Sequence, residues 1–200
     1  MEDSTQPEAS AHFPEYNILG AELTTFVLQP GFVEGIETEP LSFSNLVDAY
    51  RHLFRNNKEY AVLLWNGIPI RLSYHEDIPY GVEGLIEFLE RLIAGKNEAS
   101  LLFKSENLEA TIRANQDGKN LTLELSCNKV SGNYQAALSP VSLLKIERDA
   151  FLGEWKIVID QLTRSMIQSG YSLSSVNDNK IIKRLIAFND RISQRGMLYR

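Results

Sequence analysis

The sequence predicts an α+β fold, with an antiparallel sheet built from hairpins and packed on one face by about four helices. Two turn dipeptides, Asn66-Gly67 and Asp117-Gly118, stand between stretches of strand character and indicate β-hairpins. Other segments carry apolar residues at the spacing of an amphipathic helix. Because these helices do not alternate regularly with the strands, the order of elements favours an α+β domain over a parallel sheet.

The domain organisation follows from length and composition. Residues 1–14 are acidic and polar, which predicts a flexible acidic tail, and residues 15–200 contain no repeat, so we expect a single α+β domain. The N-terminus lacks the positive start and apolar stretch of a secretory signal, and no apolar run reaches the ~18 residues that span a bilayer. Cys127 has no partner for an internal disulfide. We therefore expect a cytoplasmic protein without membrane contact.

The N-terminal quarter of the chain contains one clear element. Short apolar pieces at residues 16–19 and 26–28, separated by glycine and proline, predict one or two strands. An amphipathic helix is expected next, because apolar side chains recur at i, i+1, i+4, i+7 and i+8 (Leu46, Val47, Tyr50, Leu53 and Phe54).

Residues 59–74 form the first predicted hairpin. Asn66-Gly67 supplies the positive φ angles of a type I′ turn. The apolar face then consists of three cross-strand pairs: Trp65 with Ile68, Leu63 with Ile70, and Ala61 with Leu72. Pro69 falls in a non-hydrogen-bonded pair and lacks the N–H that a further strand would need, so the second strand should be a sheet edge.

A helix and a second hairpin follow. Residues 82–93 carry a helical apolar stripe, Gly95 stands where the helix should end, and Asp77 is expected to cap its start. The segment 101–103 predicts a strand that leads into the second hairpin. A loop at Asp117-Gly118 predicts these pairs on the apolar face: Ala114 with Leu121, Ile112 with Leu123, Ala110 with Leu125, and Leu108 with Cys127.

The C-terminal part predicts a strand within residues 140–147, a long helix over residues 149–169 and a final helix from Ser175. The final helix carries a basic stripe of Lys180, Arg184, Arg191 and Arg195. Such a stripe can hold phosphates, but the net charge of −6 and the few interleaved aromatics disfavour nucleic acid. A solvated face, or a match to the acidic N-terminal region, is the favoured interpretation.

Charge is divided unevenly along the chain. The first 50 residues contain nine acids and neither Lys nor Arg, whereas the remainder contains 17 acids and 20 bases. If both parts fold together, one side of the surface should be acidic and should attract a basic partner. The alternative is that the acids only keep a solvated tail soluble.

The run His75-Glu76-Asp77 is the main candidate for chemistry. Successive side chains that leave a strand point to alternate faces, so these three converge on one ion only if the chain turns sharply. Asp48 and His52 stand at i and i+4, but two ligands do not make a zinc site. No phosphate loop, zinc motif or nucleophile motif occurs, so we assign no catalytic residue, no metal and no cofactor.

The function that these patterns favour is a non-catalytic, cytosolic protein-binding module with a basic protein as its partner. As a class, the chain resembles bacterial immunity proteins, which are small acidic α+β domains that neutralise a toxin; this resemblance is architectural and transfers no residue. The alternative is a metal-dependent or acid/base enzyme that uses His75, Glu76 and Asp77. The sequence leaves the oligomeric state open. The candidate binding residues surround the end of the first hairpin: Pro69, Tyr74, His75, Glu76 and Tyr80.

Overall fold

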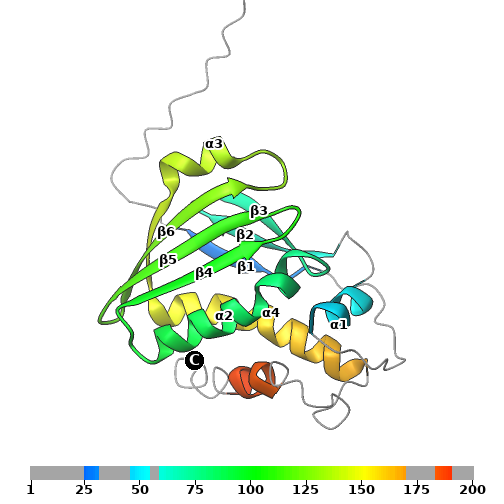
Figure 1. The fold of residues 1–200 in the computed structure, drawn as a ribbon. Helices are drawn as coiled ribbons and strands as arrows, with labels where there is room; N and C mark the ends of the chain where they lie inside the picture. Colours follow the sequence, from blue (N-terminus) through cyan, green and yellow to red (C-terminus); the bar gives the residue numbers. More distant parts are fainter. Residues whose placement is uncertain (1–24, 32–45, 55–58, 170–182, 191–200) are drawn as a thin grey trace, which may run out of the picture.

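The computed structural model describes residues 25–31, 46–54, 59–169 and 183–190 (Figure 1). The expected tail at residues 1–14, the possible strand at residues 16–19 and the start of the final helix at Ser175 lie outside the described residues. The same holds for every acid of the first 50 residues except Asp48.

Seven strands in the described part of the chain form two antiparallel sheets, which together with the helices confirms the predicted α+β class. The division into two sheets was not predicted. Sheet A has the order β1 (Phe26–Gln29), β2 (Tyr60–Trp65) and β3 (Ile68–Ser73). Sheet B has the order β4 (Glu98–Lys104), β5 (Glu109–Asp117), β6 (Asn120–Lys129) and β7 (Leu143–Glu147).

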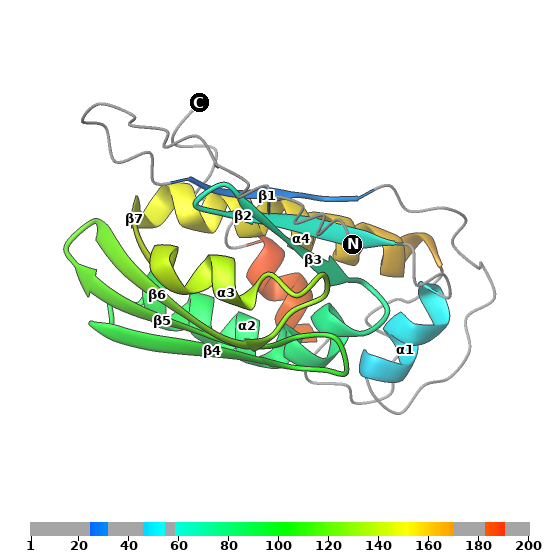
Figure 2. The same ribbon diagram turned by 90° about the horizontal axis from the view of Figure 1, so that it is seen from above.

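The two long helices of the described residues run alongside edge strands, α2 beside β4 and α4 beside β1. In Figure 1, α2 and α4 lie below the strands and α3 lies above them, and Figure 2 shows sheets A and B on opposite sides of the molecule. Residues 183–190 are also helical. None of the helices in the described ranges has the length and apolar character that crossing a membrane requires. Their bounds are α1 (Leu46–Leu53), α2 (Asp77–Ile93), α3 (Gln135–Leu138), the 3₁₀ turn η1 (Ser139–Val141) and α4 (Arg148–Gln168).

The first hairpin has the predicted register. Trp65 pairs with Ile68, and Asn66 and Gly67 have φ angles of 47° and 83°, as a type I′ turn requires. β3 lies at the edge of sheet A, which confirms the interpretation of Pro69.

The register predicted for the second hairpin is wrong. Ala114 pairs with Leu123 instead of Leu121, and Asp117 pairs with Asn120. Gly118, at φ 59°, is the first central residue of the turn, and Lys119 does not have a positive φ. This is the pattern of a type II′ turn, which favours glycine at that position. The shift moves the partners of Ala110, Ile112 and Ala114 by two residues, so the same side chains still face the core, and Leu108 precedes β5.

One core joins the two sheets. Trp155 of α4 packs against Phe103 of β4 and Phe26 of β1, with ring centroids 6.4 Å apart in both cases. The Trp65 indole N–H also donates to the Val141 carbonyl at 3.0 Å, which ties the tip of the first hairpin to the turn before β7. Burial of these large rings is a major source of stability.

Candidate functional site

Tyr74 lies in the core rather than on the surface. Its ring stacks on Phe54 at a centroid distance of 5.1 Å, and its hydroxyl accepts a hydrogen bond from the Gly31 N–H at 3.3 Å. Burial raises the pKa of Tyr74 to about 12. Tyr74 thus stabilises the connection between β3 and α2 by packing in the core.

Asp77 has a structural role that differs from the predicted one. α2 begins at Asp77, the N-cap position is Glu76, and no side chain makes a cap hydrogen bond, so the predicted Asp77 cap is wrong. The Asp77 carboxylate instead accepts hydrogen bonds from the Ser73 N–H, at 2.8 Å, and from the Ser105 hydroxyl. Burial raises the pKa of Asp77 although both hydrogen bonds act in the opposite direction. The carboxylate thus links the end of β3 to the loop that follows β4 through these two hydrogen bonds.

Arg51 reaches from α1 to the first turn of α2. Its Nη2 donates to Glu76 Oε1 at 2.8 Å, and its Nη1 lies 3.4 Å from the Tyr80 hydroxyl. The guanidinium carbon is 5.8 Å from the centroid of the Tyr80 ring, within the range of a cation–π contact. The hydrogen bond and charge of Glu76 raise the pKa of Arg51, which therefore remains a cation.

His75 is held by the backbone of α1's C-terminal end. Its Nδ1 lies 2.7 Å from the Phe54 carbonyl oxygen, which can only accept, so Nδ1 carries a proton. Its Nε2 lies 3.5 Å from Glu76 Oε1. Both ring nitrogens therefore face protein oxygens.

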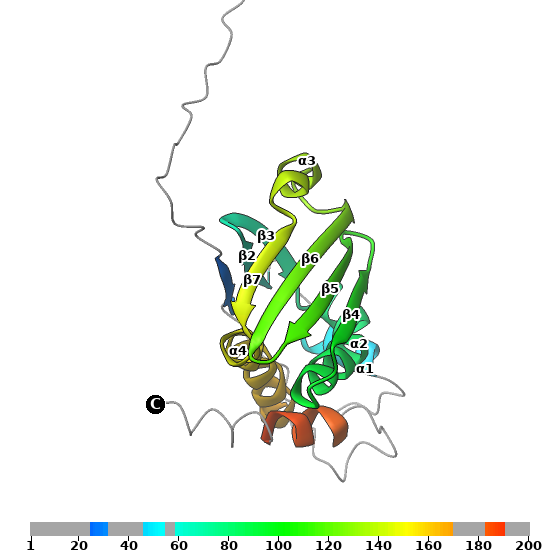
Figure 3. The same ribbon diagram turned by 90° about the vertical axis from the view of Figure 1, so that its left-hand side faces the viewer.

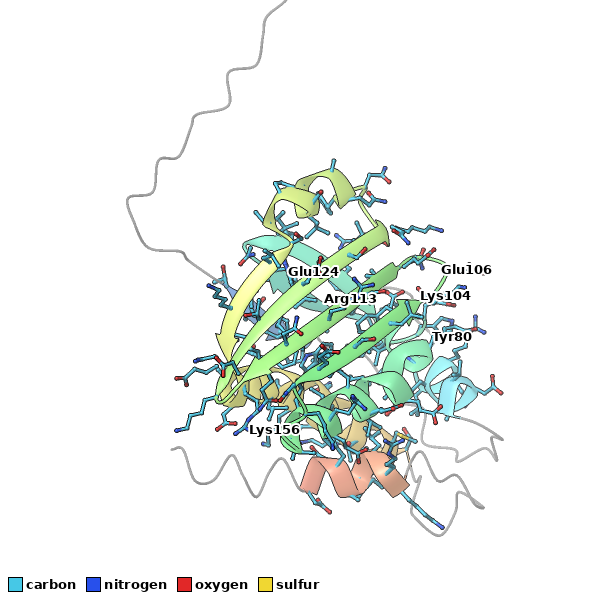
Figure 4. All side chains as sticks on the ribbon, turned by 60° about the vertical axis from the view of Figure 1, so that its left-hand side comes forward. Tyr80, Lys104, Glu106, Arg113, Glu124 and Lys156 are labelled. Carbon is cyan, nitrogen blue, oxygen red and sulfur yellow. The ribbon has the colours of Figure 1, made fainter. Side chains whose placement is uncertain are left out.

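These side chains form what we call the Arg51 patch: Arg51, His75, Glu76 and Tyr80. The Arg51 side chain is 41% exposed and Tyr80 is 49% exposed, whereas the side chains of Glu76 and His75 are 12% and 19% exposed. Arg51 and Tyr80 thus face outward, Glu76 binds Arg51, and His75 lies against Glu76. Figure 4 shows Tyr80 on the same side of the molecule as Lys104 and Glu106.

Pro69 does not belong to this patch. It is exposed near the start of β3, whereas the patch follows the end of that strand. At a rise of about 3.3 Å per residue, Pro69 lies roughly 13 Å from Ser73. The structure therefore separates Pro69 from the other candidate binding residues.

The alternative function, an enzyme, would use the carboxylates and imidazole of the His75-Glu76-Asp77 run. In the structure these groups bind other groups of the protein. Both oxygens of Asp77 accept protein hydrogen bonds, and Glu76 is paired with Arg51. Asp48 and His52 lie on α1. Among the described residues, no group of three or more His, Cys, Asp or Glu side chains is arranged to hold a metal ion.

One member of the predicted basic stripe has an intramolecular partner. Arg184 donates to Glu90 of α2, and this hydrogen bond, with the charges of Glu90, Glu87 and Glu83, raises its pKa. Among the described residues, the acids that act on Arg184 belong to α2, and the predicted match to the acidic N-terminal region lies outside these residues. The other members, Lys180, Arg191 and Arg195, lie outside the described residues.

Arg51 was not predicted as a binding residue. Arg51 and Glu76 are 25 positions apart and meet only because α1 lies against the start of α2. For Tyr74 a signal existed, since the alternation of β3 continues from the buried Leu72 to Tyr74. Comparison with known proteins found no matching family model, no matching curated protein and no matching solved structure.

Proposed function

We propose that the protein is a non-catalytic, cytosolic protein-binding module and that the Arg51 patch is part of its binding surface. The observation that carries this proposal is the exposed pair of Arg51 and Tyr80. Arginine and tyrosine are enriched among the residues that dominate binding energy in protein interfaces. Both combine a large contact area with hydrogen-bond donors, so they suit a partner surface that offers carbonyl or carboxylate oxygens.

The fixed geometry of the pair supports the same proposal. Arg51 is held by the 2.8 Å ion pair with Glu76, and Tyr80 lies in the first turn of α2, which Asp77 joins to Ser73 and Ser105. A side chain that is already ordered loses less conformational entropy when a partner binds. The formal charges of Arg51 and Glu76 cancel, so the patch can approach a partner of either sign.

The proposed partner is a basic protein. The net charge of −6 favours approach of a basic surface, and Glu83 and Glu87 are exposed on α2, which also carries Tyr80. The architectural resemblance to immunity proteins makes a basic toxin the first partner to test. In that case the protein would neutralise the toxin by covering part of its surface.

Affinity capture with matched variants tests the proposal. The wild type, Arg51→Ala, Tyr80→Ala and Tyr134→Ala are each tagged and used to capture proteins from host lysate at moderate salt. Tyr134 is 43% exposed and lies outside the Arg51 patch, so it is the matched control. We expect a basic protein that the wild type and Tyr134→Ala retain and that the two patch variants lose. A partner retained equally by all four proteins would contradict the role of the patch.

A further inference from the structure

Each of the four edge strands has a side chain on at least one outward backbone group. Each sheet has two edges, which are β1 and β3 in sheet A and β4 and β7 in sheet B. Pro69 further blunts β3 because it has no N–H to donate. Outside β4, the covering contacts are Glu154 on the Leu28 N–H of β1 at 2.7 Å, Asp77 on the Ser73 N–H of β3 at 2.8 Å, and Asn66 on the Leu143 carbonyl of β7 at 2.8 Å.

On β4 the side-chain contact lies at the first residue of the strand, and the centre of the strand is open. The Asn97 carbonyl accepts a hydrogen bond from the Gln116 N–H at 2.7 Å, so the backbone groups of Asn97 face β5. Because successive residues of a strand direct their backbone groups to alternate sides, those of Ser100 and Leu102 face away from β5. Arg91 donates to the Glu98 carbonyl, at one end of the strand. Among the described residues, no group hydrogen-bonds to the outward backbone of Ser100 or Leu102. Figure 3 shows β4 at the outer margin of sheet B.

A depression adjoins the same edge. It has a volume of about 560 Å³ and lies between α2 and the first half of β4, where Gly84 presents no side chain. The ideal Cβ position of Gly84 would have only Leu101, at 3.8 Å, as a neighbour. Gly84 therefore leaves space beside Leu101, whereas Glu87 and Arg91 of α2 line the remainder of the depression.

We infer that β4 pairs in antiparallel register with β4 of a second copy, about a two-fold axis at Leu101. The strand sequence, EASLLFK, is self-complementary in this register. Glu98 stands opposite Lys104 of the second copy at both ends, and Ser100 stands opposite Leu102. Registers shifted by two residues lose this double charge match. The outward backbone groups of Ser100 and Leu102 then exchange hydrogen bonds with the second copy.

Leu102 supplies apolar surface at the axis. Its side chain lies on the open face of sheet B, and Leu102 is 53% exposed. In the proposed register, Leu102 and Leu102 of the second copy are diagonal neighbours on this face, within reach of each other. Their contact removes exposed apolar surface from water.

The pairing should be weak, because a single pair of strands buries less surface than a typical stable interface. We expect a dimer with a Kd of about 10–100 µM. Arg91 competes for the Glu98 carbonyl and further limits the affinity. The inference does not rest on the proposed function, since the Arg51 patch and the β4 edge are tested by different variants.

Sedimentation equilibrium with charge-swap variants tests the inference. Glu98→Lys and Lys104→Glu each place like charges opposite each other, so each variant alone should associate about tenfold more weakly than the wild type. An equimolar mixture of the two variants should regain wild-type association, because each strand end again faces an opposite charge. A loss of association that mixing does not restore would overturn the proposed register.

A proline variant provides the second test. Ser100→Pro removes an outward N–H and no hydrogen bond to β5, as Pro69 already does on β3, so the circular-dichroism spectrum should be unchanged and the protein monomeric. A wild type that remains monomeric up to about 1 mM would overturn the inference. So would association that neither Ser100→Pro nor the charge swaps weaken.

Discussion

Replacement of Asp77 by alanine removes the carboxylate that joins β3, α2 and the loop after β4. The Ser73 N–H then loses a hydrogen bond to a charged group, which is worth about 1.5–3 kcal/mol. The Ser105 hydroxyl can turn to the Leu108 carbonyl, 3.5 Å from its oxygen. Removal of the buried charge offsets part of the loss, so we expect a decrease of about 2 kcal/mol in the free energy of unfolding.

Asp77→Asn is the matched control. Its amide oxygen can accept from the Ser73 N–H while its nitrogen donates to the Ser105 hydroxyl oxygen, so the cost should stay below about 1 kcal/mol. Urea unfolding at pH 7, followed by the fluorescence of the buried Trp65 and Trp155, measures both variants. A decrease of less than about 0.5 kcal/mol for Asp77→Ala, the range of surface substitutions, would refute the structural role of Asp77.

The pH dependence of the same variants gives a second result. Burial raises the pKa of Asp77 in the folded protein above its unfolded value of about 4. In the pH interval between the two values, the folded protein binds more protons than the unfolded chain, so rising pH lowers stability. The wild type should therefore lose stability relative to Asp77→Asn as the pH rises from about 4 toward neutrality. A constant or increasing difference would contradict the direction of the pKa change.

Three further substitutions probe the packing of α2 and the contact between α4 and β1. Gly81→Ala should destabilise the protein because the new Cβ would lie 2.7 Å from the buried Phe103 ring, whereas Gly84→Ala meets nothing closer than 3.8 Å and should add up to about 1 kcal/mol. Thermal unfolding of both variants tests whether Gly81→Ala lowers stability and Gly84→Ala raises it. Equal effects of the two substitutions would contradict this expectation. Glu154→Ala should expose the Leu28 N–H and lower its protection from hydrogen exchange by at least about tenfold, and unchanged protection would argue against the contact between α4 and β1.

Local rules predicted the elements better than their arrangement. The Asn66-Gly67 turn, the helical stripes of α2 and α4 and the edge position of Pro69 depend on neighbouring residues, and all were predicted. The second register was wrong because Gly118 can occupy either central position of a two-residue turn. The division into two sheets depends on contacts between distant segments, such as Leu28 with Glu154, which no local pattern specifies.

The candidate site was predicted only in part. His75, Glu76 and Tyr80 were placed near each other because they are close in sequence, and the structure brings them together on one patch. Arg51 belongs to another helix, and its contact with Glu76 depends on how α1 packs against α2. Pro69 is separated from the patch by the length of β3, which was calculable from the strand's rise per residue.

Photo-crosslinking at position 80 tests the central proposal most directly. A photoreactive phenylalanine analogue replaces Tyr80 in one variant and Tyr134 in the other, and both are irradiated in host cells before analysis by mass spectrometry. Since both positions are exposed to a similar degree, 49% and 43%, they sample their surroundings equally. We expect one abundant basic protein that is crosslinked at position 80 and absent at position 134. No adduct at position 80, or the same adducts at both positions, would contradict binding through the Arg51 patch.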